Sequence, residues 1–318
     1  MPHKVKIVSS LPVGEFLSRH ADVLGLTLQG PAHGLDRLIR EPAINRPGLA
    51  LAGFFSYFAP KRIQVLGHAE MAYLRKLTPQ MRSHRFQQVC ERDVPCFVIA
   101  RGTILPDDVA AVAAERQIPV LGTPMVTMNF LNAATIQLEN EFAPSTTLHG
   151  CMVDIRGIGV LITGKSGSGK SETAIGLLER GAALVADDVV RVRAVAGELI
   201  ASSPDLSRGY LEMRGIGIIN VANLFGLTAI RPEKHLDLVV TLKAHADLNA
   251  VDRLGLQQRN YEILGCPVAH IEVPVAPGRD TARMIVVAAL DRQLRKLGYN
   301  MADEFNQRLL RKMAGETP

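Results

Sequence analysis

The feature that most constrains the fold of this chain is the segment 159–188, which reads GVLITGKSGSGKSETAIGLLERGAALVADD. Residues 164–171 within it match the pattern Gly-x-x-x-x-Gly-Lys-Ser. An apolar stretch typical of a buried strand precedes this pattern, and the spacing of Ala174 and Leu177 behind it indicates a helix that ends near Gly181. A glycine-rich loop between a strand and a helix predicts an α/β fold with a phosphate-binding loop, or P-loop.

Each residue type in this loop suits the binding of ATP phosphates. Glycines let backbone N–H groups converge on the phosphates, and the helix N-terminus adds a favourable dipole. Lys170 supplies a cation for the β- and γ-phosphates, and Ser171 offers a hydroxyl to Mg²⁺. The predicted nucleotide-binding residues are Gly164, Lys165, Ser166, Gly167, Ser168, Gly169, Lys170 and Ser171.

Two further blocks carry acidic residues. The apolar stretch ALVADD ends in Asp187 and Asp188, and successive side chains of a strand point in opposite directions. One aspartate can therefore face a metal and the other an acceptor, although the pair alone would fit a helix cap or a solvated turn equally well. The second block, LEMRGIGIINVANLFG at 211–226, offers Glu212 as a metal ligand and Arg214 as a phosphate or carboxylate partner. Its alternative interpretation is a buried strand with a polar rim.

Missing motifs exclude several classes of P-loop protein. A guanine-specific switch should carry NKxD, a transporter ATPase should carry a stretch like LSGGQ, and a helicase should carry more motifs with a basic track. None of these occurs in the sequence. A kinase-like enzyme remains, with an acceptor that binds outside the loop.

Composition limits the partners and the compartment. The net charge of +5 is spread thinly over 36 basic and 31 acidic residues without a polybasic run, so we expect no nucleic-acid partner. The strongest apolar run, MIVVAAL at 284–290, is too short to span a bilayer, and the start of the chain lacks a signal-peptide core. The four cysteines show no CxxC spacing and are expected to be free buried thiols. We therefore expect a cytoplasmic protein without a membrane segment.

The chain divides into two expected domains. An N-terminal α/β domain at 1–132, of unclear ligand, precedes a P-loop kinase domain of mixed sheet and helices at 133–318. The first contains a strand–helix–strand unit over 96–123, and residues 143–147 are expected to be a linker after a helix. The end of the chain predicts two helices. One face of the first would contain Met284, Val287, Ala288 and Leu294 and would pack in the core or at a subunit interface.

Several motifs together resemble one known family. They are LHG (148–150), GKSGSGKSETA (164–174), LVADD (184–188), LEMRGIGIINVANLFG (211–226), PVAPGR (274–279) and, in the first domain, RPGLALAGFFSYFAPKRIQVLGHAE (46–70). This combination resembles HPr kinase/phosphorylase over nearly the whole chain. The resemblance implies ATP-dependent, Mg²⁺-dependent phosphorylation of a serine in the phosphocarrier protein HPr. It also implies the reverse phosphorolysis with orthophosphate, which releases pyrophosphate, and a homohexamer.

The resemblance also implies roles for individual positions. The catalytic residues would be His149, Lys170, Asp188 and Arg253, with Asp188 as the acid/base and Arg253 on a mobile loop. Magnesium would be bound by Ser171 and Glu212. The dephosphorylation region would comprise Pro274, Val275, Ala276, Pro277, Gly278 and Arg279. Ala276 stands where many relatives have a second arginine. The loss of this cation would weaken the binding of orthophosphate, and so would affect phosphorolysis more than the kinase reaction.

Two alternatives remain on the sequence alone. One is a P-loop kinase or phosphatase acting on a small phosphorylated metabolite, with the N-terminal domain as a sensor. The other is a nucleotide-regulated binding module without catalysis. Asp188 opposes the second alternative, because a pure binding site has little need of a base at that position.

Overall fold

The structure is a computed structural model in which the chain forms two compact units, each with its own sheets and core. It describes residues 4–244, 259–276 and 278–313. The N-terminal unit spans Ile7–Ala143. The C-terminal unit begins at Pro144 and also takes in the segment that ends at Lys6, which forms a bridge with Ser145.

Helix α6 (Thr127–Phe142) is the last element of the N-terminal unit. The expected division between residues 132 and 133 falls inside this helix. Its buried side chains Phe130, Ala134 and Leu138 belong to the apolar core of the N-terminal unit. A helix whose apolar face is already committed to one core continues with that core to its end, which is why the change of unit follows α6.

The N-terminal unit is built on a five-stranded sheet in the order β2-β7-β6-β5-β4. Its strands are β2 (Thr27–Leu28), β4 (Ile44–Asn45), β5 (Ile63–Leu66), β6 (Phe97–Ile99) and β7 (Val120–Gly122). Strands β4 to β7 are parallel, and β2 is antiparallel to β7. A separate pair joins β1 (Leu11–Pro12) to β3 (Leu38–Ile39). The predicted strand–helix–strand unit is present as β6, α5 (Asp107–Glu115) and β7.

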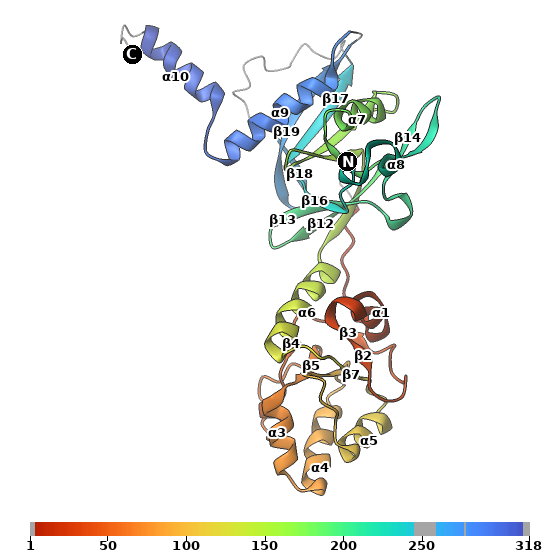
Figure 1. The fold of residues 1–318 in the computed structure, drawn as a ribbon. Helices are drawn as coiled ribbons and strands as arrows, with labels where there is room; N and C mark the ends of the chain where they lie inside the picture. The colour runs from red at the N-terminus through yellow and green to blue at the C-terminus, as the bar shows by residue number, and fades with distance from the viewer. Residues whose placement is uncertain (1–3, 245–258, 277, 314–318) are drawn as a thin grey trace. The chain divides into compact units, whose positions relative to one another are not determined.

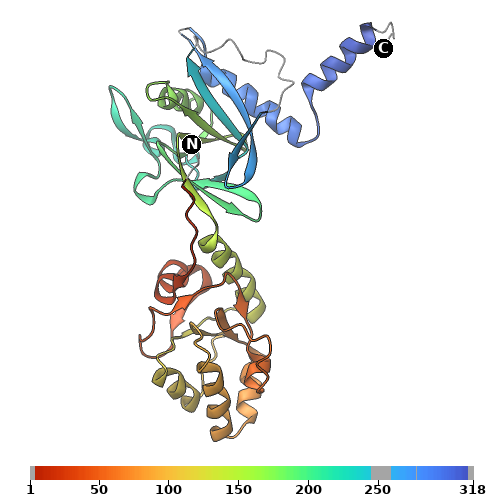
Figure 2. The same ribbon diagram turned by 180° about the vertical axis from the view of Figure 1, so that it is seen from behind.

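Helices cover both faces of this sheet (Figures 1 and 2). They are α1 (Val13–Leu24), α2 (Gly48–Leu51), α3 (His68–Lys76), α4 (Pro79–Cys90), α5 and α6. Consecutive strand residues point to opposite faces, so Leu66 and Phe97 join the core beneath α3, α4 and α5. Val65 and Val98 join the core beneath α1 and α6. The N-terminal unit is therefore a three-layer α/β/α structure, as an α/β fold predicts.

The described residues of the C-terminal unit form two larger sheets and a separate two-stranded sheet. The six-stranded sheet has the order β11-β9-β10-β17-β19-β18, the four-stranded sheet has the order β16-β13-β12-β8, and β14 pairs with β15. Strands of the first are β9 (Cys151–Ile155), β10 (Ile158–Gly164), β11 (Ala183–Ala186), β17 (Leu238–Ala244), β18 (Arg259–Ile263) and β19 (Cys266–Val275). The others are β8 (Ser145–His149), β12 (Val189–Val195), β13 (Glu198–Ser202), β14 (Tyr210–Met213), β15 (Gly217–Asn220) and β16 (Glu233–His235).

The six-stranded sheet is the middle layer of this unit. The helices are α7 (Lys170–Leu178), α8 (Val221–Phe225), α9 (Thr281–Lys296) and α10 (Met301–Met313), with short 3-10 turns at Asp205–Ser207 and Leu227–Ala229. On β10, Val160 and Ile162 pack into the core that α7 and α9 cover. Leu161, between them, packs into the core shared with the four-stranded sheet. This alternation explains why β10 is apolar on both faces.

One expectation for this unit needs correction. The expected linker 143–147 is largely strand β8, which pairs with β12 in the register Val189↔His149. Its polar composition suits a strand of the outer sheet, in which exposed and buried residues alternate.

The predicted hairpin around Gly197 is confirmed as β12 and β13. Within the described residues, no helix combines the length and apolar character needed to cross a bilayer.

The expected packed face of α9 lies partly outside the core of the chain. Met284 and Val287, expected in the core or at a subunit interface, are 37% and 58% exposed, whereas Ala282, Ile285 and Ala289 are buried. The neighbouring helix α7 explains the difference. A Cβ added at Gly176 of α7 would lie 3.1 Å from the Cβ of Ala282, so the two helices approach closely only through small residues.

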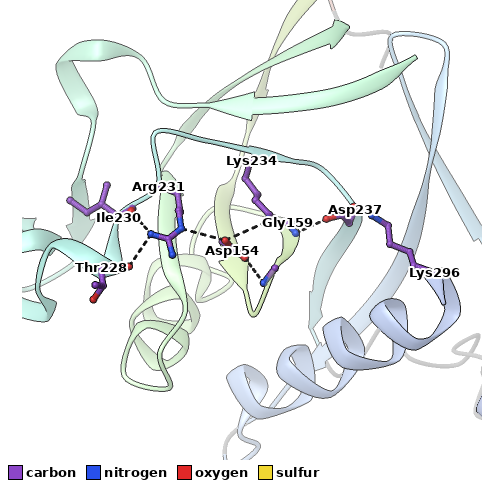
Figure 3. Close-up of polar contacts among 9 residues, drawn as sticks. Asp154, Gly159, Thr228, Ile230, Arg231, Lys234, Asp237 and Lys296 are labelled. Atoms are coloured by element: carbon purple, nitrogen blue, oxygen red, sulfur yellow. Dashed lines mark hydrogen bonds and ion pairs between the residues drawn. The ribbon is translucent and has the colours of Figure 1, made fainter. Parts of the chain in front are cut away.

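Two buried carboxylates hold the amino end of β10 in place (Figure 3). Asp237 accepts from the backbone N–H of Gly159 at 2.8 Å and pairs with Lys296 of α9. Asp154 lies 3.6 Å from Arg231 and 3.4 Å from Lys234. Because the Asp237 contacts join the start of β10 to α9 and to the residue that precedes β17, they fix the strand that leads into the P-loop.

Candidate active site

The P-loop leaves β10 at the edge where the parallel strands of the six-stranded sheet end. Residues 164–169 join β10 to α7, and Gly164, Gly167 and Gly169 have φ angles of 154°, 79° and 85°. A Cβ at Gly164 would lie 2.6 Å from the Ser168 Oγ, so the tight turn requires glycine there. The loop therefore has the strand–loop–helix context that its sequence pattern predicts.

The side chains of Lys170 and Ser168 supply polar groups to the loop. Lys170 Nζ donates to the carbonyl oxygens of Gly164 and Lys165 at 3.2 and 3.3 Å, so the ammonium folds back over the loop. The Ser168 Oγ is buried and has no hydrogen-bond partner among the described residues. An unpartnered buried hydroxyl next to a lysine at a helix N-terminus is suited to phosphate oxygens.

His149 and Asp188 lie close together because two connections between the four-stranded and the six-stranded sheet are neighbours. His149 ends β8 and is followed by β9, while Asp188 lies between β11 and β12. The N–H of Gly150 donates to the carbonyl oxygen of Asp188 at 3.1 Å. A Cβ at Gly150 would lie 2.5 Å from the Ile162 carbonyl oxygen, so only glycine permits this crossing. As a result, His149 Nδ1 lies 3.9 Å from Asp188 Oδ1.

The Asp188–His149 pair is open to solvent. Their side chains are 79% and 82% exposed, so a large acceptor can reach them without an opening of the protein. Asp188 has a φ of 59°, a left-handed conformation that aspartate adopts more readily than most residues. This conformation belongs to the turn that carries the chain from one sheet to the other.

Asp187 has a different environment from its neighbour. Burial raises the pKa of the Asp187 carboxyl, opposed by hydrogen bonds from the backbone N–H groups of Glu212 and Asp188. Its Oδ2 accepts from the Glu212 N–H at 3.1 Å. Behind it, burial raises the pKa of the Cys151 thiol well above its usual range, and the Asp187 charge adds to this effect. The two aspartates therefore do face different surroundings, and Asp187 attaches β14 to the end of β11.

The β14–β15 hairpin reaches the P-loop. At its turn, Arg214 Nη2 donates to the Ser166 Oγ at 3.2 Å. Glu212 and Arg214 are both exposed, and they lie on β14 and just beyond it. The hairpin thus brings an acid and a guanidinium from residues 211–226 toward the phosphate-binding loop. The contact between Ser166 and Arg214 could not be read from their separation in sequence.

The stretch 274–279 lies at the same edge of the sheet. Strand β17 is parallel to both β10 and β19, with the registers Gly164↔Leu242 and Leu242↔Val273. Pro274 and Val275 end β19, and the Arg279 N–H donates to the Ala276 carbonyl oxygen at 3.1 Å just before α9. The predicted dephosphorylation region is therefore separated from the P-loop by one strand.

The described residues among those that the sequence predicted for the site lie at the same edge of the sheet. His149, Asp188 and the P-loop gather at one edge, Glu212 joins them through Asp187, and Arg279 follows β19 at the same edge. Arg253 and Pro277 lie outside the described residues. Across the described part of the chain, no three His, Cys, Asp or Glu residues form a cluster that could hold a metal ion. Cys151 is a free buried thiol, as expected, but its place behind Asp187 could not be predicted, because a cysteine in a buried strand carries no pattern of its own.

Family models match both parts of the chain. The model described as the HPr serine kinase N terminus matches residues 12–138, and the model described as the HPr serine kinase C-terminal domain matches residues 140–309. The two matches meet near the end of α6.

Named relatives are similar over most of their own length. An HPr kinase/phosphorylase of Brevibacillus brevis is 40% identical over 293 residues, covering 92% of this chain and 94% of the relative. One from Shouchella clausii is 43% identical over 277 residues, covering 87% and 89%. A solved structure of the Hpr(Ser) kinase/phosphatase from Coxiella burnetii is 35% identical, covers 50% of this chain and 98% of its own, and has a TM-score of 0.47. With both family models matched, the protein belongs to the HPr serine kinase family.

Proposed function

We propose that this protein transfers the γ-phosphoryl group of ATP to a serine hydroxyl of HPr, and that it also catalyses the reverse phosphorolysis. In the reverse reaction orthophosphate attacks phosphoserine-HPr, which yields serine-HPr and pyrophosphate. The kinase and phosphorylase activities agree with the names of the relatives in the family. The alternative of a kinase for a small metabolite has no support in these comparisons.

One observation carries the proposal furthest: an exposed carboxylate–imidazole pair lies at the sheet edge that also carries a P-loop. The 79% exposure of the Asp188 side chain suits an acceptor hydroxyl on the surface of another protein. A metabolite kinase gains from enclosing its small acceptor and excluding water. A protein acceptor can shield the site with its own surface instead.

The P-loop residues are proposed to hold the nucleotide. Lys170 would exchange its contacts with the Gly164 and Lys165 carbonyl oxygens for the β- and γ-phosphates. The unpartnered Ser168 hydroxyl fits a phosphate oxygen in the same loop. Arg214, held 3.2 Å from Ser166, would add a cation at the rim.

Mg²⁺ is proposed as the metal, bound by Ser171 and Glu212. A hydroxyl in the first turn of α7 and a single nearby carboxylate suit this ion, which uses few protein ligands and takes the rest from phosphate and water. When bound, it neutralises charge on the phosphate oxygens. Asp187 is proposed as a positioning residue, because its carboxylate fixes the backbone of Glu212.

Asp188 is proposed as the acid/base of both directions. In the forward direction its carboxylate takes the proton of the serine hydroxyl while the serine oxygen bonds to the γ-phosphorus and the bond to ADP breaks. In the reverse direction an orthophosphate oxygen bonds to the phosphorus, the bond to serine breaks, and Asp188 returns the proton to the serine oxygen. His149, 3.9 Å away, is placed to pair with this carboxylate when protonated.

The remaining roles rest on the family resemblance. Arg253 would stabilise charge on the transferring group, and residues 274–279 would serve the attacking orthophosphate. With Ala276 in place of a second arginine, Arg279 would carry that task with less support. A homohexamer and a cytoplasmic location are proposed on the same basis.

The test is incubation of the purified protein with γ-labelled ATP and purified HPr, in parallel with a panel of sugars and organic acids. We expect the label to appear on a serine of HPr. When orthophosphate is then added, HPr should lose the label and labelled pyrophosphate should form. HPr with its acceptor serine changed to alanine is the matched control. Labelling of a small molecule but not of HPr would overturn the proposal.

A further inference from the structure

Three neighbouring strands of the six-stranded sheet change from apolar to polar just before the P-loop begins. On β10, β17 and β19, the residues that precede this change are buried in the core shared with the four-stranded sheet: Leu161, Val239 and Val268. Two residues further along each strand, on the same face, are Thr163, Thr241 and His270. All three are half-buried, in a place where aliphatic side chains would extend the core. Their polar groups therefore indicate a role besides packing.

These three side chains form a continuous line of hydrogen bonds across the strands, the Thr–Thr–His row. Thr163 Oγ1 lies 3.0 Å from Thr241 Oγ1, and Thr241 Oγ1 lies 2.8 Å from His270 Nε2. The register Thr163↔Thr241 of the parallel strands β10 and β17 places the two hydroxyls side by side. His270 reaches the second hydroxyl from β19, on the other side of β17. The row thus joins the last side chain before Gly164 to β19, two strands away from β10.

The direction of the row follows from the protons available to it. Each threonine hydroxyl donates one proton and also accepts. Burial lowers the pKa of the His270 imidazole, an effect that Glu272 opposes, so the ring is neutral at pH 7 and accepts at Nε2 when its proton is on Nδ1. A second acceptor for Thr163, the Val240 carbonyl oxygen, lies at 3.4 Å, farther away than the Thr241 hydroxyl. Thr163 therefore donates to Thr241, and Thr241 donates to His270.

The imidazole at the end of the row is packed against β18. The ring of Tyr261 meets the ring of His270 edge-on, with centroids 5.6 Å apart and an angle of 69° between the planes. Further along the same face, the Glu272 carboxylate lies 2.7 Å from Lys243 and 3.2 Å from Arg259. A ring held in this way gives the hydroxyl of β17 an acceptor in a fixed position.

The P-loop begins directly after the row. Gly164 has a φ of 154°, and its carbonyl oxygen accepts from Lys170 Nζ at 3.2 Å. Thr163 and Gly164 share a peptide group, so a hydrogen bond that holds Thr163 also holds the start of the loop. We propose that His270 is a positioning residue for nucleotide binding, which acts through Thr241 on Thr163 and so keeps the first turn of the P-loop in the geometry that receives phosphate. The inference rests on the proposed function of this loop as the nucleotide site.

The first test is amide hydrogen exchange of the full chain, measured by mass spectrometry without ATP or HPr. Thr241→Val and His270→Leu should speed the exchange of peptides that cover residues 160–170 by at least about threefold. Thr241→Ser keeps a hydroxyl and His270→Gln keeps a neutral acceptor, so both should exchange like the parent protein. Peptides from the hairpin 189–202 should be unchanged in all four variants, which separates a local role from a general loss of stability. Because no nucleotide is involved, this readout decides the inference even if the kinase proposal fails.

The second test is the affinity for a fluorescent ATP analogue. Thr241→Val and His270→Leu should each weaken binding about fivefold, as expected for the loss of one hydrogen bond. The double variant should also lose about fivefold rather than about twenty-five-fold, because both changes interrupt the same row. Thr241→Ser and His270→Gln should stay within about twofold of the parent protein. The matched controls Thr228→Val and His235→Leu, at exposed positions outside the row, should bind like the parent protein.

Three results would overturn the inference. They are unchanged exchange of residues 160–170 in His270→Leu, equal losses of affinity in Thr241→Val and Thr241→Ser, and a double variant whose loss is the product of the two single losses.

Discussion

At the scale of single residues, the proposed site depends on groups whose surroundings differ sharply over short distances. Asp187 and Asp188 are neighbours in sequence, yet burial raises the pKa of the first, and the second is 79% exposed. The exposed carboxylate is available to an acceptor, and the half-buried one holds the backbone of Glu212 in place. A strand that ends at a crossing between two sheets produces this difference, because its last residues leave the sheet in opposite directions.

Replacing the loop lysine tests the assignment of the nucleotide site. Lys170→Ala should lower the rate of HPr phosphorylation by at least about 10²-fold, since a fixed cation at the transferring phosphate is lost. Phosphorylation is measured with labelled ATP, and circular dichroism checks the fold. Lys61→Ala, an exposed lysine of the N-terminal unit, is the control and should retain the parent rate. Turnover near that of the parent protein in Lys170→Ala would refute the assignment.

Replacing the proposed acid/base should damage both reactions. Asp188→Asn keeps the shape of the side chain but cannot take up or return a proton, so each rate should fall by about 10²–10⁴-fold. The two measurements are ATP-dependent phosphorylation of HPr and phosphate-dependent pyrophosphate release from phosphoserine-HPr. Asp36→Asn, an exposed aspartate of the other unit, should leave both rates unchanged. An Asp188→Asn enzyme impaired in one direction alone would contradict a shared acid/base.

Arg279 should serve mainly the reverse reaction. Its guanidinium follows β19 at the P-loop edge of the sheet, and Ala276 supplies no second cation there. Arg279→Ala should therefore slow pyrophosphate release by about tenfold more than it slows phosphorylation of HPr, as expected for the loss of a single cation at a phosphate. Both rates are measured on one preparation, with Arg283→Ala, at an exposed position in the first turn of α9, as the control. Equal losses in the two directions would rule out this division of roles.

At the scale of elements, the site rests on a sheet whose strands are anchored at the opposite end. The Asp237 carboxylate joins the start of β10 to α9 through Gly159 and Lys296, and the Asp237 carbonyl oxygen accepts from Arg292 at 3.2 Å. Figure 3 shows that Asp154 holds Arg231 and Lys234 beside this anchor. Since β10 leads directly into the P-loop, a shift of its first residues would also displace the phosphate site.

Removal of the Asp237 carboxylate should therefore cost stability. Asp237→Ala leaves the Gly159 N–H without its acceptor in a buried position, and we expect a loss of about 1–3 kcal/mol in the free energy of unfolding. Urea unfolding followed by circular dichroism measures the change. The control Asp205→Ala removes an exposed ion pair with Arg208 and should stay within about 0.5 kcal/mol of the parent protein. A loss no larger than that of the control would show that the anchor is dispensable.

At the scale of the whole molecule, assembly and metal dependence remain proposals. Exposed apolar side chains occur on the C-terminal helix α10, where Phe305 and Met313 are 65% and 77% exposed. Light scattering should give the mass of a homohexamer at micromolar concentration, and excess EDTA should remove phosphorylation of HPr, with activity restored by added Mg²⁺. A stable monomer would contradict the first expectation, and full activity in EDTA would contradict the second.

The local patterns of the sequence determined the elements on which the chemistry is built. The P-loop, the strand before it and the helix after it follow from glycine spacing and apolar periodicity, which involve neighbours in the chain. The strand–helix–strand unit around α5 and the hairpin around Gly197 were predicted for the same reason. The motifs at 46–70, 148–150, 164–174, 184–188, 211–226 and 274–279 in combination indicated the family.

Only the tertiary structure decided how distant segments meet. His149 lies beside Asp188 because β8 and β12 pair, and Arg214 reaches Ser166 because Asp187 holds β14 to the end of β11. The close approach of α7 at Gly176 determines which face of α9 packs on the core. At this distance small residues such as Ala282 fit, and larger apolar side chains lie on the opposite face. Such choices depend on which surfaces are brought together, and a periodic pattern in one segment carries no information about the shape of its partner.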